Sequence, residues 1–152
     1  MSKANVLNGF AHPKGDKDNA VFLEDSFVPQ RIEYSIAAGG ANVCEVTLTI
    51  QDGHGGAIEK PINLDIWLSD DSAGTGLTAT SASGTVQAKS GEGADFGIYT
   101  AKKALRVQTK ADGTYTLEIT DSAKTGFYVA SQLPFAGLTV ASRQLVTGDY
   151  GA

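Results

Sequence analysis

The sequence contains one cysteine and four prolines in 152 residues, and no stretch of it is hydrophobic for long. A single cysteine excludes the intrachain disulfides that often stabilise secreted domains of this size. No apolar run approaches the ~20 residues that a membrane-crossing helix needs, and residues 1–10 lack the apolar core of a secretory signal. We therefore expect a chain that does not contact a membrane and that does not pass through the secretory pathway.

Positive charge and metal-binding side chains are also scarce. Twelve Lys and Arg residues stand against 17 Asp and Glu residues, so nucleic acid is not expected as a direct partner. Lys102, Lys103 and Arg106 form only a small basic patch, which at most suits an acidic protein surface. Two histidines and one cysteine are too few for a typical zinc site, and the spaced ligands of a calcium loop are absent. The sequence predicts no metal and no cofactor.

Motifs for catalysis are missing too. No Gly-x-Ser-x-Gly nucleophile elbow occurs, neither histidine has a recognisable catalytic partner, and no glycine-rich phosphate loop is present. Two acidic clusters, Asp52 with His54 and Asp70 with Asp71, follow predicted strands, and we interpret them as turn chemistry. These observations predict a protein that is not an enzyme.

The chain does have a regular alternation of large apolar and polar residues. It is clearest in residues 46–50, 62–68 and 115–119, and a period of two places the apolar side chains on one face of a pleated strand. Eighteen glycines and many small residues separate such segments, with no convincing helix between them. We predict an all-β fold, an antiparallel β-sandwich of immunoglobulin-like or jelly-roll type with about seven to nine strands.

The turn residues between these segments indicate how the strands connect. Asp112-Gly113 separates two alternating runs and predicts a β-hairpin between them. Residues 72–97 are poor in bulky side chains and predict only one or two short strands, near 76–88. The other predicted strands cover residues 32–36, 41–51, 61–69, 104–109, 113–120, 126–131 and 138–146.

Residues 1–30 differ from the rest of the chain. Phe10, Phe22 and Phe27 lie in a segment without sustained periodicity, and a polar, turn-rich run separates the first from the others. This pattern predicts an extended N-terminal arm over 1–30 that lies across another surface, followed by a sandwich domain over 31–152. The alternative is an irregular strand and loop packed on its own domain.

Two single residues carry predictions of their own. Cys44 shares the parity of Val46 and Leu48 and is expected to be a buried, unreactive thiol. Trp67 has the opposite parity to Ile66 and Leu68, so strict alternation places its indole on the polar face, either covered by the arm or presented to a partner. A bulge that turns the ring into the core is the alternative.

Five segments together carry a family resemblance: residues 66–70, 75–84, 100–105, 119–130 and 142–146. They resemble a group of small virion proteins encoded by tailed bacteriophages and prophages, and the resemblance covers about residues 43–152. It implies a capsid decoration or cement role on the outside of the head, in a particle assembled in the bacterial cytoplasm. The implied partners are the major capsid protein and neighbouring copies of the chain, with a homotrimer as one arrangement. No active-site residue is implied.

We expect Phe10, Phe22, Phe27 and Trp67 to make the contacts to protein partners. One alternative is a tail, baseplate or fibre-base module, which copy number per virion would distinguish from a head protein. Another is a carbohydrate-binding sandwich that uses Trp67 and tyrosines such as Tyr99 or Tyr128 as a platform for sugars.

Overall fold

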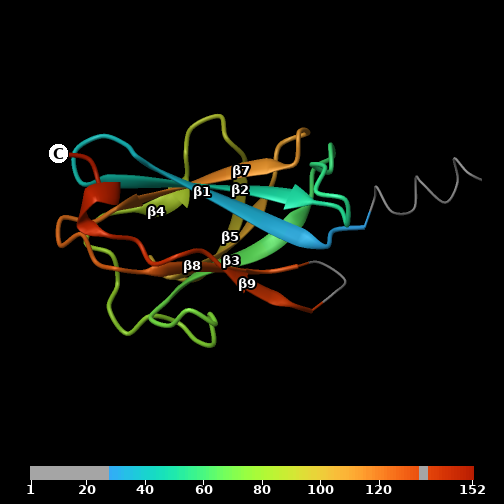
Figure 1. The fold of residues 1–152 in the computed structure, drawn as a ribbon. Coiled ribbons are helices and arrows are strands. Elements are labelled where there is room, and N and C mark those ends of the chain that lie inside the picture. The colour runs from blue at the N-terminus through green and yellow to red at the C-terminus, as the bar shows by residue number, and fades with distance from the viewer. Residues whose placement is uncertain (1–27, 134–136) are drawn as a thin grey trace, which may run out of the picture.

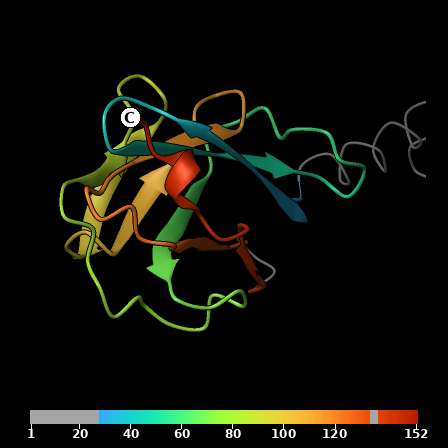
Figure 2. The ribbon, with the colours of Figure 1, turned by 60° about the vertical axis from the view of Figure 1, so that its left-hand side comes forward.

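The computed structural model describes residues 28–133 and 137–152, and this part of the chain forms nine strands and one short 3-10 helix. The strands lie in two layers, which Figures 1 and 2 show from two directions. The prediction of an all-β sandwich with antiparallel sheets is confirmed. The elements are β1 (Arg31–Ala38), β2 (Val43–Gln51), β3 (Asn63–Ser69), β4 (Val86–Ala88), β5 (Ala94–Thr100), β6 (Ala104–Gln108), β7 (Thr114–Thr120), β8 (Tyr128–Gln132), β9 (Thr139–Ala141) and η2 (Thr147–Asp149).

One sheet has the strand order β1-β2-β7-β4 and the other has the order β5-β6-β3-β8-β9. Alternation along each central strand decides which side chains enter the core between them. On β2 every second residue from Cys44 to Ile50 is fully buried, and on β3 Leu64, Ile66 and Leu68 are buried in the same way. The predicted burial of Cys44 is therefore confirmed. Full burial of each large apolar side chain in this core stabilises the fold by roughly 1.5–3 kcal/mol relative to leaving that side chain exposed.

The predicted hairpin through Asp112-Gly113 is wrong. A tight turn is present, with the Lys110 N–H donating to Thr114 O at 2.8 Å, but the flanking strands β6 and β7 belong to different sheets. Both strands carry one apolar face, and the two faces meet across the core instead of lying side by side. The backbone groups of β7 pair with β2 and β4, while those of β6 pair with β3 and β5.

Residues 94–100 form β5, a strand that the sequence pattern did not predict. The register against β6 shifts between Asp95 and Gly97 and again between Ile98 and Thr100. Each shift adds one residue to β5 without a partner, which breaks the period of two. The alternation used to predict the other strands is therefore missing here.

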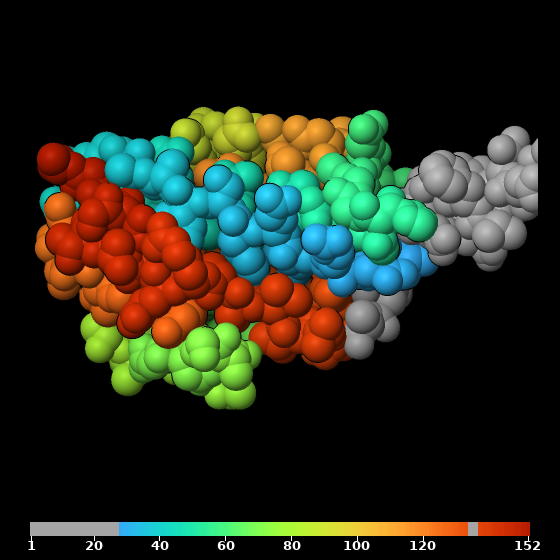
Figure 3. All heavy atoms as spheres, viewed as in Figure 1, coloured from blue at the N-terminus to red at the C-terminus, as the bar shows by residue number. Residues whose placement is uncertain are grey.

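The two lateral edges of the sandwich are built differently. At one edge the Tyr34 hydroxyl on β1 donates to Val140 O on β9 at 2.7 Å, and the C-terminal segment lies along β1, as the red and blue spheres of Figure 3 show. Gly151 forms a parallel bridge with Ala41. At the other edge β4 has only three residues, and the Ala88 N–H donates to the Asp95 carboxylate of β5 at 2.8 Å.

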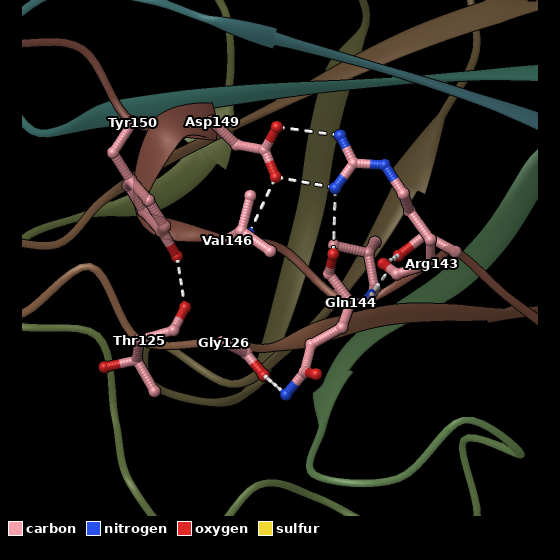
Figure 4. A network of polar contacts seen from close by, with 9 residues as sticks. Thr125, Gly126, Arg143, Gln144, Val146, Asp149 and Tyr150 are labelled. Carbon is pink, nitrogen blue, oxygen red and sulfur yellow. Dashed lines mark hydrogen bonds and ion pairs between the residues drawn. The ribbon is translucent and has the colours of Figure 1, made fainter.

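A polar network fixes the C-terminal segment to the sandwich (Figure 4). Arg143 and Asp149 form two parallel hydrogen bonds of 2.7 Å, and the same carboxylate accepts the Val146 N–H. The buried Tyr150 donates its hydroxyl to Thr125 O at 2.7 Å. Arg143 lowers the pKa of the Asp149 carboxyl by hydrogen bonding to it. The chain end is thus part of the folded domain.

Within residues 28–133 and 137–152 the structure contains no helix that could span a lipid bilayer. The part of the predicted arm that covers residues 1–27 lies outside the described residues, and with it Phe10, Phe22 and Phe27. The strand β1 begins at Arg31.

Candidate binding site on the outer face of the five-stranded sheet

The outer face of the five-stranded sheet combines aromatic and charged side chains. Strand β3 keeps strict alternation without a bulge, so Asn63, Asp65 and Trp67 lie on this outer face while the residues between them are buried. The alternative that a bulge turns the Trp67 ring into the core is therefore wrong. Neighbouring strands add Tyr99, Arg106 and Gln132 to the same side of the sheet.

Trp67 is half-buried because the loop that follows β3 covers part of its ring. The indole Nε1–H donates to Gly74 O at 3.0 Å. Gly74 has φ of 67°, and a Cβ there would lie 2.7 Å from the Cβ of Ala130 on β8, so glycine alone lets this loop approach the sheet. The cover on Trp67 thus comes, in part, from its own domain.

Asp70 and Asp71 hold this loop in shape. The Asp71 carboxylate accepts the Thr75 hydroxyl at 2.6 Å and the Ala73 N–H at 2.8 Å, and the Thr75 hydrogen bond lowers the pKa of Asp71. Asp70 accepts the Thr78 hydroxyl and the Ala79 N–H. The interpretation of this acidic cluster as turn chemistry is confirmed.

The second acidic cluster has the same role in the turn after β2. The Asp52 carboxylate accepts the backbone N–H groups of His54 and Gly56 at 2.8 and 3.0 Å. These bonds, first that of Gly56, lower the pKa of Asp52. The turn reverses the chain briefly, with Gln51 bridging Ala57, before the chain crosses to the other sheet.

A charged cluster connects three strands on the outer face. Arg106 of β6 donates to both carboxylate oxygens of Asp65 on β3, at 2.8 and 3.0 Å, and the Tyr99 hydroxyl of β5 donates to the same carboxylate at 3.0 Å. The Arg106 hydrogen bond lowers the pKa of Asp65, against burial, which raises it. Asp65 is therefore a fixed anionic acceptor at physiological pH.

Two hollows lie next to each other on this face, and Asp65 lines both. One has a volume of about 320 Å³ and apolar walls that include Trp67, Leu77 and Tyr99. The other, of about 350 Å³, is more polar, and its lining includes Asn63, Arg106 and Gln132. Together they form a shallow surface with an aromatic end and a hydrogen-bonding end, which could bind a ligand that offers both kinds of group.

Beside the aromatic hollow lies β5, and all seven of its residues are exposed. Phe96 is 57% exposed, Ile98 70% and Tyr99 58%. Apolar side chains that are exposed next to one another on a surface are typical of interaction sites. The strand pairs with β6 on one side only.

The structure therefore brings two sequence-predicted residues together, since Trp67 and Tyr99 line the same hollow. Tyr128 of β8 lies on the same face, where it is paired with Ser69 of β3, but it does not line either hollow. Sequence reasoning missed the pairing of Asp65 with Arg106 and the exposed Leu77. The shared parity of Asp65 and Trp67 was the available signal for the former.

Within the described ranges no group of three or more His, Cys, Asp and Glu side chains is placed to hold a metal ion. Comparison of the chain with protein-family models, with curated proteins and with solved structures found no match.

Proposed function

We propose that the chain is a structural protein of a tailed-bacteriophage virion, a decoration protein that binds the outside of the assembled head and links neighbouring major capsid subunits. The observation that carries this proposal is the apolar hollow lined by Trp67, Leu77 and Tyr99, beside an edge strand that leaves Phe96 and Ile98 exposed. Aromatic residues of this kind are enriched in protein interfaces. The segment resemblance to small virion proteins supplies the identity of the partner.

The strand order supports an immunoglobulin-like arrangement for this domain. In the immunoglobulin fold one sheet contains strands A, B, E and D and the other contains C, F and G. Assigning β1, β2, β7 and β4 to the first set reproduces its order, and β3, β8 and β9 follow the second. Strands β5 and β6 extend the second sheet beyond the C position.

Binding of this kind stabilises a particle by mass action, because a ligand that binds only the assembled lattice shifts it away from disassembly. The test compares intact heads, heads stripped of the protein, and stripped heads to which it is added back. Intact and reconstituted heads should lose their DNA at a higher temperature than stripped heads. Equal melting of stripped and intact heads would contradict the proposal.

Two variants assign the contact to this face. Tyr99→Ala should weaken rebinding to stripped heads at least tenfold, because the exposed ring lines the apolar hollow. Val146→Ala removes an equally exposed side chain, at 55%, on the C-terminal segment and should rebind like wild type.

A second candidate, binding of carbohydrate, is favoured by the neighbouring hollows. Trp67 and Tyr99 offer ring faces for the apolar side of a sugar, and Asp65 and Arg106 offer an acceptor and donors for hydroxyl groups. A glycan array probed with the whole chain tests it. Binding that disappears in Tyr99→Ala and in Trp67→Ala supports this candidate, and an array without signal contradicts it.

A further inference from the structure

Strand β5 leaves one edge and both faces open. Among the described residues its unpaired edge has no backbone hydrogen bond along 94–100, since its ladder runs to β6 alone. Ile98 is paired with Leu105 and shares its side of the sheet, whereas Tyr99 reaches Asp65 on the outer side. Apolar groups are therefore exposed on both sides of one edge strand, a geometry that can accept another strand.

The sequence contains a segment with the complementary pattern. Residues 21–23 are Val-Phe-Leu, three consecutive apolar residues, and such a run places apolar side chains on both faces of a strand. Most strands of the domain alternate instead, because only one of their faces is buried. A segment that is apolar on both sides matches an edge that is apolar on both sides.

The charged residues that follow the two segments indicate how residues 20–25 would be oriented relative to β5. Lys102 and Lys103 follow β5, and their ammonium groups donate to backbone carbonyls of Ser83 and Ala79, at 2.9 Å each. Within 28–133 and 137–152 neither lysine forms an ion pair. Glu24 and Asp25 follow the apolar run directly. If residues 21–23 lie beside residues 96–99 and run parallel to β5, Glu24 and Asp25 lie next to Lys102 and Lys103.

We propose that residues 20–25 of one copy add to the open edge of β5 in a second copy, with Val21, Phe22 and Leu23 against Phe96, Ile98 and Tyr99. Glu24 and Asp25 then lie next to Lys102 and Lys103 of that second copy. The two register shifts in β5 interrupt its edge, so the added strand is short. This self-association is a property of the free chain and does not depend on the virion role.

The segment of the same copy cannot make this contact. Asp25 is six residues from Arg31, and six extended residues span at most about 20 Å. Arg31 pairs with Gln51, at the end of the sandwich that carries the turn of Lys110 and Gly113, whereas Lys102 lies at the other end and at the opposite lateral edge. With sheets ~10 Å apart, strands ~4.8 Å apart and ~3.3 Å per residue, the separation is about 30 Å even in a straight line.

The experiment measures self-association of the full chain by sedimentation equilibrium. Wild type should associate, and Phe22→Asp and Ile98→Asp should each weaken association at least tenfold. Leu138→Asp is the matched control, because Leu138 is 57% exposed next to β9, at the opposite edge of the same sheet, and it should associate like wild type. Ile98→Asp changes an exposed side chain, so circular dichroism should show an unchanged fold.

A charge exchange tests the partners directly. The variant Lys102→Glu with Lys103→Glu, and the variant Glu24→Lys with Asp25→Lys, should each associate weakly alone. An equal mixture should recover association, because each segment then meets an edge of opposite charge. Failure of the mixture to recover, or a wild-type chain that stays monomeric, would overturn the proposal. A monomeric wild type whose Ile98→Asp variant no longer binds stripped heads would assign this edge to the capsid protein and leave the virion role intact.

Discussion

Strands β3 and β5 have the same length of seven residues and belong to the same sheet, but they differ in what they bury. On β3 Leu64, Ile66 and Leu68 are at most 3% exposed, whereas on β5 every residue is exposed and Ile98 reaches 70%. β3 lies between β6 and β8, beneath the other sheet. β5 is an edge strand that pairs with β6 alone, and β4, the strand of the other sheet that bonds to it through Asp95, has only three residues. Burial of an apolar residue in this fold is decided by the place of its strand, and residue type alone does not predict it.

The largest expected effect comes from truncating the same residue type in the two strands. Ile66→Ala should lower the free energy of unfolding by about 3 kcal/mol, because it opens a cavity in the core. Ile98→Ala should change it by less than about 0.5 kcal/mol, as for other surface substitutions. Urea unfolding at a protein concentration where the chain is monomeric measures both. Similar losses in the two variants would show that β5 is buried after all.

The second test concerns how β5 begins. Gly93 has φ of +121°, and a Cβ there would overlap Tyr115 Cδ2. Gly93→Ala should therefore lower the free energy of unfolding by about 2 kcal/mol, from backbone strain and overpacking. Gly97→Ala is the control inside β5, where no atom lies within 4 Å of the added methyl group, and urea unfolding should find it close to wild type. A neutral Gly93→Ala would mean that β5 is free to shift away from the core.

The third test concerns the polar contact that attaches β5 to the other sheet. The buried Tyr115 donates its hydroxyl to Asp95 at 2.6 Å, and burial together with this bond raises the tyrosine pKa. Asp95→Ala should lower the free energy of unfolding by about 1 kcal/mol, because it leaves the hydroxyl without its acceptor. Asp95 also accepts the Ala88 N–H, so in a double-mutant cycle with Tyr115→Phe the part of this loss that is due to the hydroxyl should disappear and the part that is due to the Ala88 bond should remain. Additive losses would contradict a direct contact.

The smallest effect is a pH dependence of the free energy of unfolding that Asp65 causes. Asp65 is on β3 and accepts a hydrogen bond from Tyr99 of β5. Its pKa is lowered by Arg106 first and also by Tyr99, so its contribution to stability is present above the ordinary carboxyl pKa and is lost as the pH falls below about 4. Asp65→Asn should lose less stability between pH 5 and pH 3 than wild type does, measured by urea unfolding at each pH. Tyr99→Phe keeps the Arg106 pair and should retain most of the dependence.

Sequence patterns predicted the strands whose one face is buried. Alternation located β2, β3 and β7 and gave the parity of Cys44 and Trp67, because a half-buried strand imposes that period on its residues. It failed for β5, where the unpaired extra residues remove the period and no buried face imposes one. The Asp112-Gly113 turn signal correctly predicted a chain reversal but not the hairpin, since a local reversal does not determine whether the flanking strands pair with each other.

Only part of the candidate site was predicted, because alternation within one strand can be read from the sequence and contacts between segments cannot. Trp67 was identified because an indole on a polar face stands out against its strand. The register between β3 and β6 brings Arg106 to Asp65, and the loop that follows β3 brings Leu77 to Trp67. Such juxtapositions are tertiary, and a single sequence without the pairing of its strands does not contain them in readable form.

The order of the strands also has a consequence for folding kinetics. Apart from the pairs β1–β2, β5–β6 and β8–β9, each strand is followed in the chain by one from the opposite layer. Neither layer can be completed from a contiguous stretch of sequence, so much of the native network must close over long loops. We expect a single cooperative transition and refolding on the millisecond-to-second timescale that topologies of high contact order show.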